Sequence, residues 1–176
     1  MGDSVTSIGD NAFENCSSLT NIEIPDKVTR IGEYAFYGCV GLVNVIVPIG
    51  VTTLERYIFA DCIKITNITI PNSVKEIGAS AFENCAKIER IIIPDSVTKI
   101  GGWAFKNCSS LTNITIPNSV TYIGSESFRN CVSLTEVSIP SSMKTIEWAT
   151  FAGCSKLRKI TIPKSITKIE SSAFHS

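Results

Sequence analysis

The seven cysteines are the residues of this chain whose type and spacing first suggest chemistry. A cysteine thiolate can act as a nucleophile or bind zinc, and two cysteines can form a disulfide. Consecutive cysteines are 23 residues apart throughout, at Cys16, Cys39, Cys62, Cys85, Cys108, Cys131 and Cys154. Side chains stacked at this spacing point the same way, so they cannot converge on one metal ion, and pairing seven thiols always leaves one over. We therefore expect reduced cysteines buried in the core, with a few adventitious disulfides as the alternative.

Catalytic groups are scarce elsewhere in the sequence. His175 is the only histidine and is the next to last residue, so a nucleophile paired with a positioned imidazole cannot be assembled. Acidic residues show no paired spacing, and no glycine-rich phosphate loop follows a strand pattern. We expect no enzyme, no metal site and no cofactor.

The prolines and phenylalanines follow the same 23-residue period as the cysteines. A period between 20 and 50 residues indicates a solenoid, in which each unit buries its apolar face against its neighbours. The 176 residues then form a single array, residues 1–176, of about 7.5 repeats.

One unit, residues 111–133, shows how each repeat should fold. Ile114 and Ile116 alternate with Thr115, which predicts a strand that pairs in parallel with its copies and ends at Pro117. Val120 and Ile123 predict a short inward-facing extended segment on the opposite side. The residue before each cysteine is always Asn, Asp or Gly, which favours a left-handed conformation there, after a single helical turn over residues 104–106.

The repeated motif Leu-x-x-Ile-x-Ile-Pro-x-Ser-Val-x-x-Ile-Gly-x-x-Ala-Phe-x-x-Cys resembles the BspA-type leucine-rich repeat, over Ser4 to Phe174. The resemblance implies a right-handed solenoid with a parallel sheet on its concave face. It also implies a surface or secreted protein that adheres to host matrix proteins or cells. The chain departs from the family layout because it shows no recognisable signal, anchor or end caps.

Two sets of outward residues are candidate binding sites. Val43, Ile46 and Ile49 make one strand and its end apolar on the exposed side, and Arg90 and Ile92 stand out two repeats later. Such a patch is either a contact surface or neutral drift in the repeat. A second set, Tyr34, Tyr57 and Trp103, shares the position two residues before the phenylalanine, where aromatic side chains either anchor an interface or cover the turn beneath them.

The net charge of zero hides an asymmetry along the array. Residues 1–88 hold six Lys or Arg and ten Asp or Glu, and residues 89–176 hold ten and six. The leading hypothesis is a non-enzymatic solenoid that binds a host or cell-surface protein in adhesion. The alternative is head-to-tail self-assembly of oppositely charged ends into oligomers or filaments. We expect no nucleic-acid binding, and no insertion into a membrane because a span needs about 20 consecutive apolar residues.

Overall fold

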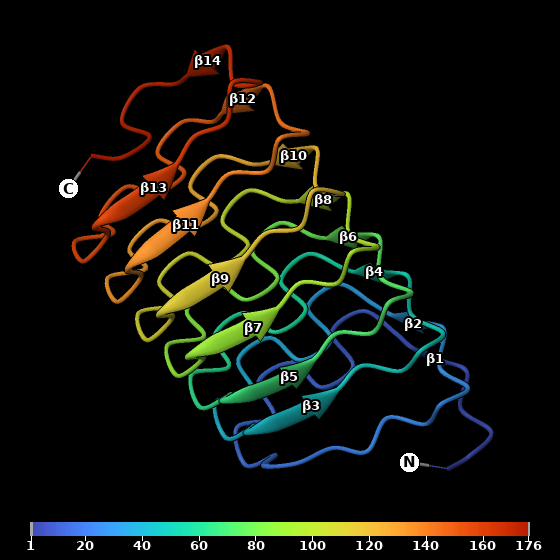
Figure 1. The fold of residues 1–176 in the computed structure, drawn as a ribbon. Helices are drawn as coiled ribbons and strands as arrows, with labels where there is room; N and C mark the ends of the chain where they lie inside the picture. Colours follow the sequence, from blue (N-terminus) through green and yellow to red (C-terminus); the bar gives the residue numbers. More distant parts are fainter. Residues whose placement is uncertain (1, 176) are drawn as a thin grey trace.

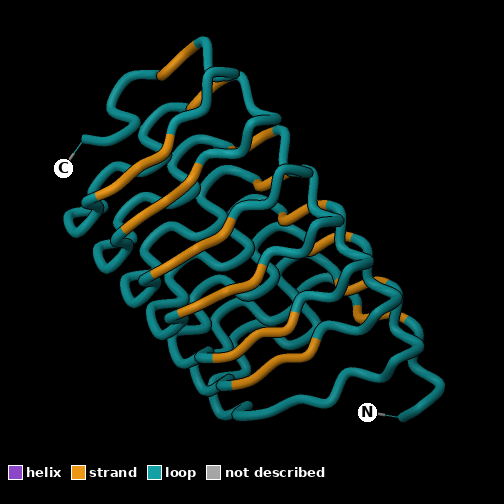
Figure 2. The backbone as a smooth tube through the Cα atoms, in the orientation of Figure 1, coloured by secondary structure: helices purple, strands orange, loops and turns teal. Residues whose placement is uncertain are grey.

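The computed structural model describes residues 2–175, which form a rod of stacked coils with the two ends of the chain at opposite ends of the rod (Figure 1). Within these residues there are fourteen short strands and no helix. Two rows of strands follow the rod along different sides, joined by turns and loops (Figure 2). The predicted solenoid of parallel coils is confirmed.

The long-strand row consists of six three-residue strands, one before each proline from Pro48 to Pro163. The strand predicted before Pro25 is reduced to a single bridge, Asn21↔Asn44. In every one of the six strands the middle side chain points into the core and the outer two are exposed. Partners are 23 residues apart, as in the parallel pairs Arg90↔Asn113 and Ile91↔Ile114. The strands are β3 (Asn44–Ile46), β5 (Asn67–Thr69), β7 (Arg90–Ile92), β9 (Asn113–Thr115), β11 (Glu136–Ser138) and β13 (Lys159–Thr161).

The short-strand row is the inward-facing extended segment that follows each proline. Each strand has two residues, and the second is buried in all but the last coil. The strands are β1 (Ser7–Ile8), β2 (Arg30–Ile31), β4 (Thr53–Leu54), β6 (Glu76–Ile77), β8 (Lys99–Ile100), β10 (Tyr122–Ile123), β12 (Thr145–Ile146) and β14 (Lys168–Ile169).

The third side of each coil differs from the prediction of a helical turn over residues 104–106. Trp103 and Asn107, which flank these residues, both have positive φ angles, 58° and 61°. The three residues between them are too few for an α-helical i→i+4 bond. Instead, the N–H of Phe105 donates to the carbonyl oxygen of Ser127 in the next coil at 2.8 Å. Short i→i+3 bonds, such as Lys106 N–H to Trp103 O at 3.0 Å, close each turn, and alternate N–H groups join it to the next coil.

Left-handed residues occupy two positions in each coil, not one. The position before cysteine has a positive φ in all seven cases, as predicted: Asn15, Gly38, Asp61, Asn84, Asn107, Asn130 and Gly153. The position two residues before phenylalanine does so as well: Asn11, Tyr34, Tyr57, Ser80, Trp103, Glu126, Ala149 and Ser172. This second position was not predicted, because its residue types are not those that favour positive φ.

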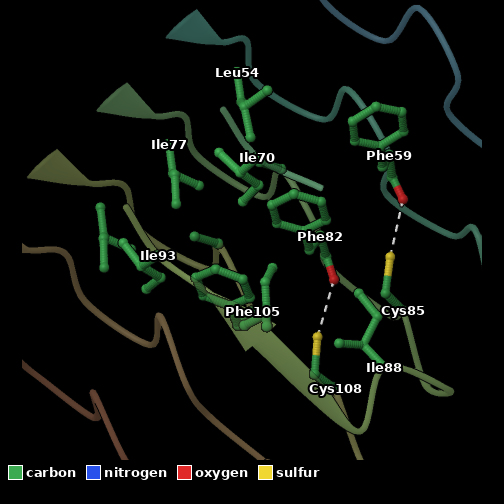
Figure 3. Packing of buried hydrophobic residues seen from close by; sticks show 14 of the residues in the cluster. Leu54, Phe59, Ile70, Ile77, Phe82, Cys85, Ile88, Ile93, Phe105 and Cys108 are labelled. Atoms are coloured by element: carbon green, nitrogen blue, oxygen red, sulfur yellow. Dashed lines mark hydrogen bonds between the residues drawn. The ribbon is translucent and has the colours of Figure 1, made fainter. Parts of the chain in front are cut away.

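Phenylalanines form the centre of the core. From Phe13 to Phe174 the rings stack in one continuous column, with neighbouring centroids 5.2 to 5.7 Å apart. Figure 3 shows Phe59, Phe82 and Phe105 in this stack, with isoleucines and Leu54 packed around them. Offset stacking of this kind adds to the free energy of burial, so each coil is held to the next by its widest side chain.

The cysteine column runs beside the phenylalanine column. Each buried thiol donates to the carbonyl oxygen of the phenylalanine in the preceding coil, as Cys108 does to Phe82 at 3.2 Å (Figure 3). The six cysteines from Cys39 to Cys154 are buried free thiols, which confirms their predicted place in the core. Cys16 is the exception: it is exposed, because it belongs to the first, incompletely covered coil.

The two rows are interrupted at different coils. The long-strand row divides between β5 and β7, whereas the short-strand row divides between β2 and β4 and between β10 and β12. Both breaks in the short-strand row occur where glycine after the strand gives way to Glu55 or Glu147. A Cβ at the equivalent Gly78 would lie 2.7 Å from the carbonyl oxygen of Leu54 in the coil before it. The coils are thus parted where a coil with glycine is followed by one with glutamate, while the other row remains paired. Glu170 follows a coil that already has Glu147, and β14 stays paired with β12.

Candidate protein-binding site

The exposed face of the long-strand row carries the predicted apolar residues. Ile46 is 70% exposed on β3 and Ile92 is 83% exposed on β7, whereas the residues at this position on most other strands are Thr, Ser or Glu. Ile46 pairs in register with Thr69, so Thr69 lies between the two isoleucines on the intervening strand. At about 4.8 Å per strand, they stand roughly 10 Å apart across the row.

Ile49 and Val43 lie at the two ends of β3. Ile49 is 76% exposed, but it follows Pro48 in a turn and is not on a strand. Val43 is half-buried, and its N–H donates to the carbonyl oxygen of Thr20 in the preceding coil. Ile46 and Ile49 are therefore the outward apolar side chains of this coil, and Val43 contributes little free surface.

Arg90 and Ile92 are brought together with residues of β5. Arg90 lines a hollow of about 270 Å³ with Thr66, Asn67, Lys87 and Glu89. A second hollow of about 320 Å³ lies along the same two strands, and Asn67, Arg90 and Ile92 are among the residues that line it. Val43, Ile46 and Ile49 border neither hollow. The predicted patch thus consists of a β3 part and a β5–β7 part.

The predicted aromatic set divides into two. The rings of Tyr34 and Tyr57 stack with centroids 4.6 Å apart, and Tyr37 packs edge-on against both, at 5.7 and 6.4 Å. Tyr37 was missed because it lies outside the column of Tyr34 and Tyr57; its signal was a third tyrosine next to a core phenylalanine. A hydrogen bond to Asp61 raises the pKa of Tyr37. Much of the surface of each ring is therefore covered by the neighbouring rings.

Trp103 stands apart from the tyrosines, because the intervening coil has the buried Ser80 at this position. The Nζ of Lys106 lies 5.8 Å from the Trp103 ring centroid, within the range of a cation–π contact. Lys106 also lies 3.5 Å from Glu83 and 4.0 Å from Glu126. Trp103 is therefore engaged in a local charge network, although 40% of its surface is exposed.

Two further exposed aromatic residues, Tyr122 and Trp148, were not selected from the sequence. Each is alone in its column, and a single aromatic residue gives no repeat signal. Tyr122 borders a shallow trough of about 450 Å³ whose floor includes Gly78, Ala79 and Gly102. Charged residues of the short-strand side also line the trough. They form the ion pairs Lys99–Glu76 at 2.7 Å and Arg56–Glu33 at 2.6 Å.

The electrostatics of the core disfavour thiol chemistry. Burial raises the pKa of Cys39 to about 11 and that of Cys154 to about 12. Burial also raises the pKa values of the four thiols between them. Because the thiolate is the reactive and metal-binding form, these six side chains remain neutral packing groups at physiological pH. His175 is exposed near the end of the last coil, and residues 2–175 contain no cluster of three potential metal ligands.

These features define the class of protein: a leucine-rich-repeat solenoid with parallel rows of short strands. The BspA type leucine rich repeat region matches residues 1–112 and 75–176, in six copies. The chain belongs to the BspA-type leucine-rich repeat family. None of the curated proteins matches it in sequence. Across residues 2–175, the structure has no helix that could cross a membrane.

Solved structures of bacterial repeat proteins share the architecture. The T. pallidum leucine rich repeat protein TpLRR is 30% identical, with a TM-score of 0.76 over 94% of this chain and 67% of that one. A leucine rich cell surface protein from Faecalibacterium prausnitzii is 29% identical, with a TM-score of 0.60 over 97% of this chain and 61% of that one. The chain thus spans about two thirds of the length of these relatives. The pneumococcal vaccine antigen PcpA, at 24% identity and a TM-score of 0.56 over 85% of this chain and 36% of that one, shares the fold.

Proposed function

We propose that this chain is a non-enzymatic binding solenoid that recognises a host or cell-surface protein through its long-strand row, in adhesion. The observation that supports the proposal is the pair of exposed isoleucines, Ile46 and Ile92, on a face whose other outward residues are mainly small or polar. Exposed apolar residues with a polar rim are typical of contact surfaces. The similarity to a protein described as a cell surface protein supports a surface or secreted location.

The absence of catalysis is part of the same proposal. Six thiols are buried and neutral, and the histidine at position 175 lies near the end of the last coil. A rigid repeat surface offers shape and side-chain chemistry for binding, and its core residues are fully used in packing.

A pull-down of host matrix and cell-surface proteins tests this function. The double variant Ile46→Glu and Ile92→Glu should lose the captured protein and keep its melting temperature, because both side chains point to solvent. The double variant Ser138→Glu and Thr161→Glu adds the same charges to the same row on β11 and β13, and should capture normally. Equal capture by both double variants would remove the apolar patch from consideration.

Head-to-tail self-assembly is the second candidate, supported by the excess of acidic residues in the first half and basic residues in the second. Opposite charges at the two ends of a rod favour a contact that repeats without closing. Light scattering against salt separates the two functions: assembly gives growth that weakens as salt is added, whereas a monodisperse monomer at low salt and high protein concentration contradicts it.

A further inference from the structure

The long-strand row is parted at one place, between β5 and β7. Hydrogen-bonded pairing joins β3 to β5, and joins β7, β9, β11 and β13, but does not connect the two groups. The short-strand row is continuous through the same coils, from β4 to β10. The coils therefore stay stacked on one side of the rod and open slightly on the other, along a single seam.

A change of residue type occurs at this seam. On the strand before it, the Nδ2 of Asn67 donates to the Oδ1 of Asn44 in the preceding coil at 3.0 Å. The next residue in this column is Arg90, and within residues 2–175 no hydrogen bond joins its side chain to that of Asn67. The amide of Asn67 therefore has no matching amide above it, and the cross-strand column of asparagines stops at the seam.

The two hollows described above follow this seam. The first is lined by residues at the amino-terminal ends of β5 and β7, and the second by residues along the strands to Ile70 and Ile92. They share Asn67 and Arg90. We call these two adjoining hollows, with Arg90 in the lining of both and Ile92 in the lining of the second, the β5–β7 furrow.

The charge in the furrow is positive and uncompensated. Among residues 2–175, Arg90 forms no ion pair, unlike Arg30, Arg56 and Arg129. Its neighbours in the column, Asn67 and Asn113, are neutral amides. Lys87 adds a second positive charge and Glu89 the one carboxylate, which leaves an excess of one positive charge in the lining. An exposed guanidinium without a partner favours a carboxylate or another planar anion.

We infer that the β5–β7 furrow binds an extended acidic peptide segment, with a carboxylate on Arg90 and an apolar side chain against Ile92. The inference rests on the proposed binding function and names the chemistry of its partner. Arg90 and Ile92 are two residues apart on one face of a strand, a distance of about 6.6 Å. A peptide lying along the furrow presents side chains at the same interval, so its acidic and apolar residues occupy positions i and i+2.

Residues already present in the same columns provide matched variants for the test. Arg90→Asn installs the residue of the neighbouring coils, and Ile92→Thr installs the residue found on β5, β9 and β13. Both should fold with an unchanged or higher melting temperature. Lys159→Asn, at the same position as Arg90 on β13, removes a positive charge away from the furrow and serves as the control.

Binding is measured by fluorescence anisotropy with a labelled peptide. The peptide alternates Glu, Thr and Leu, so that Glu and Leu are two positions apart. We expect Arg90→Asn to lower the affinity for the Glu peptide at least tenfold. The variant should also bind the Glu peptide no more tightly than the same peptide with Gln. Ile92→Thr should weaken both peptides, and Lys159→Asn should change neither. Equal binding of the Glu and Gln peptides, or unchanged binding by Arg90→Asn, would overturn the inference. Inorganic sulfate that competes as strongly as the Glu peptide would show a site for small anions only, and would overturn it too.

The failure of this inference is distinguishable from failure of the proposed function. If Ile46→Glu abolishes capture of a partner protein and Arg90→Asn does not, the proposed binding face is supported and the inference of an acidic peptide ligand is wrong. If neither variant affects capture, the long-strand row is not the binding face.

Discussion

The thiol of Cys85 donates a hydrogen bond to the carbonyl oxygen of Phe59, 3.1 Å away in the preceding coil. The same carbonyl accepts the N–H of Cys62 within its own coil at 3.2 Å. One backbone oxygen thus serves a turn and a cross-coil contact together, and the pattern recurs for every buried cysteine. Cysteine is small enough to fit beside the phenylalanine column and still offers a donor.

Thiol reactivity should reveal this arrangement directly. Under native conditions at pH 8, a thiol reagent is expected to modify Cys16 rapidly and the six buried cysteines only on unfolding, because burial both blocks access and raises their pKa values. Ellman's assay gives the count, which should rise to seven in denaturant. Cys16→Ser should remove the fast phase. Any thiol that still reacts rapidly in that variant would contradict the burial of the other six cysteines.

Truncation of a central phenylalanine should be among the most damaging substitutions. Phe82 is fully buried and stacks on Phe59 and Phe105, with centroids 5.7 and 5.3 Å away. Phe82→Ala is expected to cost about 3 to 5 kcal/mol, measured by urea denaturation. Phe13→Ala is the matched control, because Phe13 is half-buried and stacks on Phe36 alone. A loss at Phe13 as large as that at Phe82 would contradict the role of two-sided stacking.

The asparagine before Cys108 has a backbone role and a side-chain role that substitutions can separate. Asn107 has a φ of 61°, donates to Asn84 at 2.7 Å and accepts from Asn130 at 2.9 Å. Asn107→Gly keeps the backbone conformation and should cost about 1 kcal/mol for the lost side-chain bonds. Asn107→Val should cost about 1 to 2 kcal/mol more, because a β-branched residue is strained in the left-handed region. Equal unfolding free energies for the two variants would show that the conformation is not limiting.

Glu55 should make stability depend on pH. Burial raises the pKa of its carboxyl above the ordinary 4.5, and the carboxylates of Glu33 and Glu76 act in the same direction. Since the folded state holds the proton more tightly than the unfolded state, ionisation of Glu55 destabilises the fold above its folded-state pKa, and the penalty disappears below 4.5. Glu55→Gln should therefore melt higher than the parent at pH 7, with the difference closing as the pH falls. A difference that is constant with pH would rule out this cause.

The strand pattern and the core columns could be predicted because every position is sampled many times. Ile114 and Val120 are single residues, but their equivalents repeat the same apolar type, so burial follows from the sequence alone. The left-handed position before cysteine was likewise visible, since only Asn, Asp and Gly occupy it. The prediction of a helical turn was wrong because each coil has a second left-handed position. Residues such as Tyr34 and Trp103 occupy it, and their types do not indicate a positive φ.

The candidate site was only partly predictable, for the opposite reason. Ile46, Arg90 and Ile92 were selected because they differ in type from the equivalent residues of most other repeats. Such a difference is not repeated along the chain, so the repeat pattern cannot support it. The parting of β5 from β7 is a relation between two neighbouring coils, which no single repeat encodes. Tyr37 and Trp148 also occur once in their columns, so the packing of Tyr37 and the exposure of Trp148 had to be seen in three dimensions.

The cross-coil bonds of the cysteine and asparagine columns join residues 26 or 23 positions apart, always in the same direction along the chain. In the cysteine column, excision of one whole unit from the interior brings an identical thiol beside an identical backbone carbonyl, and duplication does the same. A gene for such a protein can therefore gain or lose units by unequal recombination without breaking the fold. Outward residues such as Arg90 are gained or lost with their unit, so the length of the rod and the chemistry of its exposed surface can change in the same event.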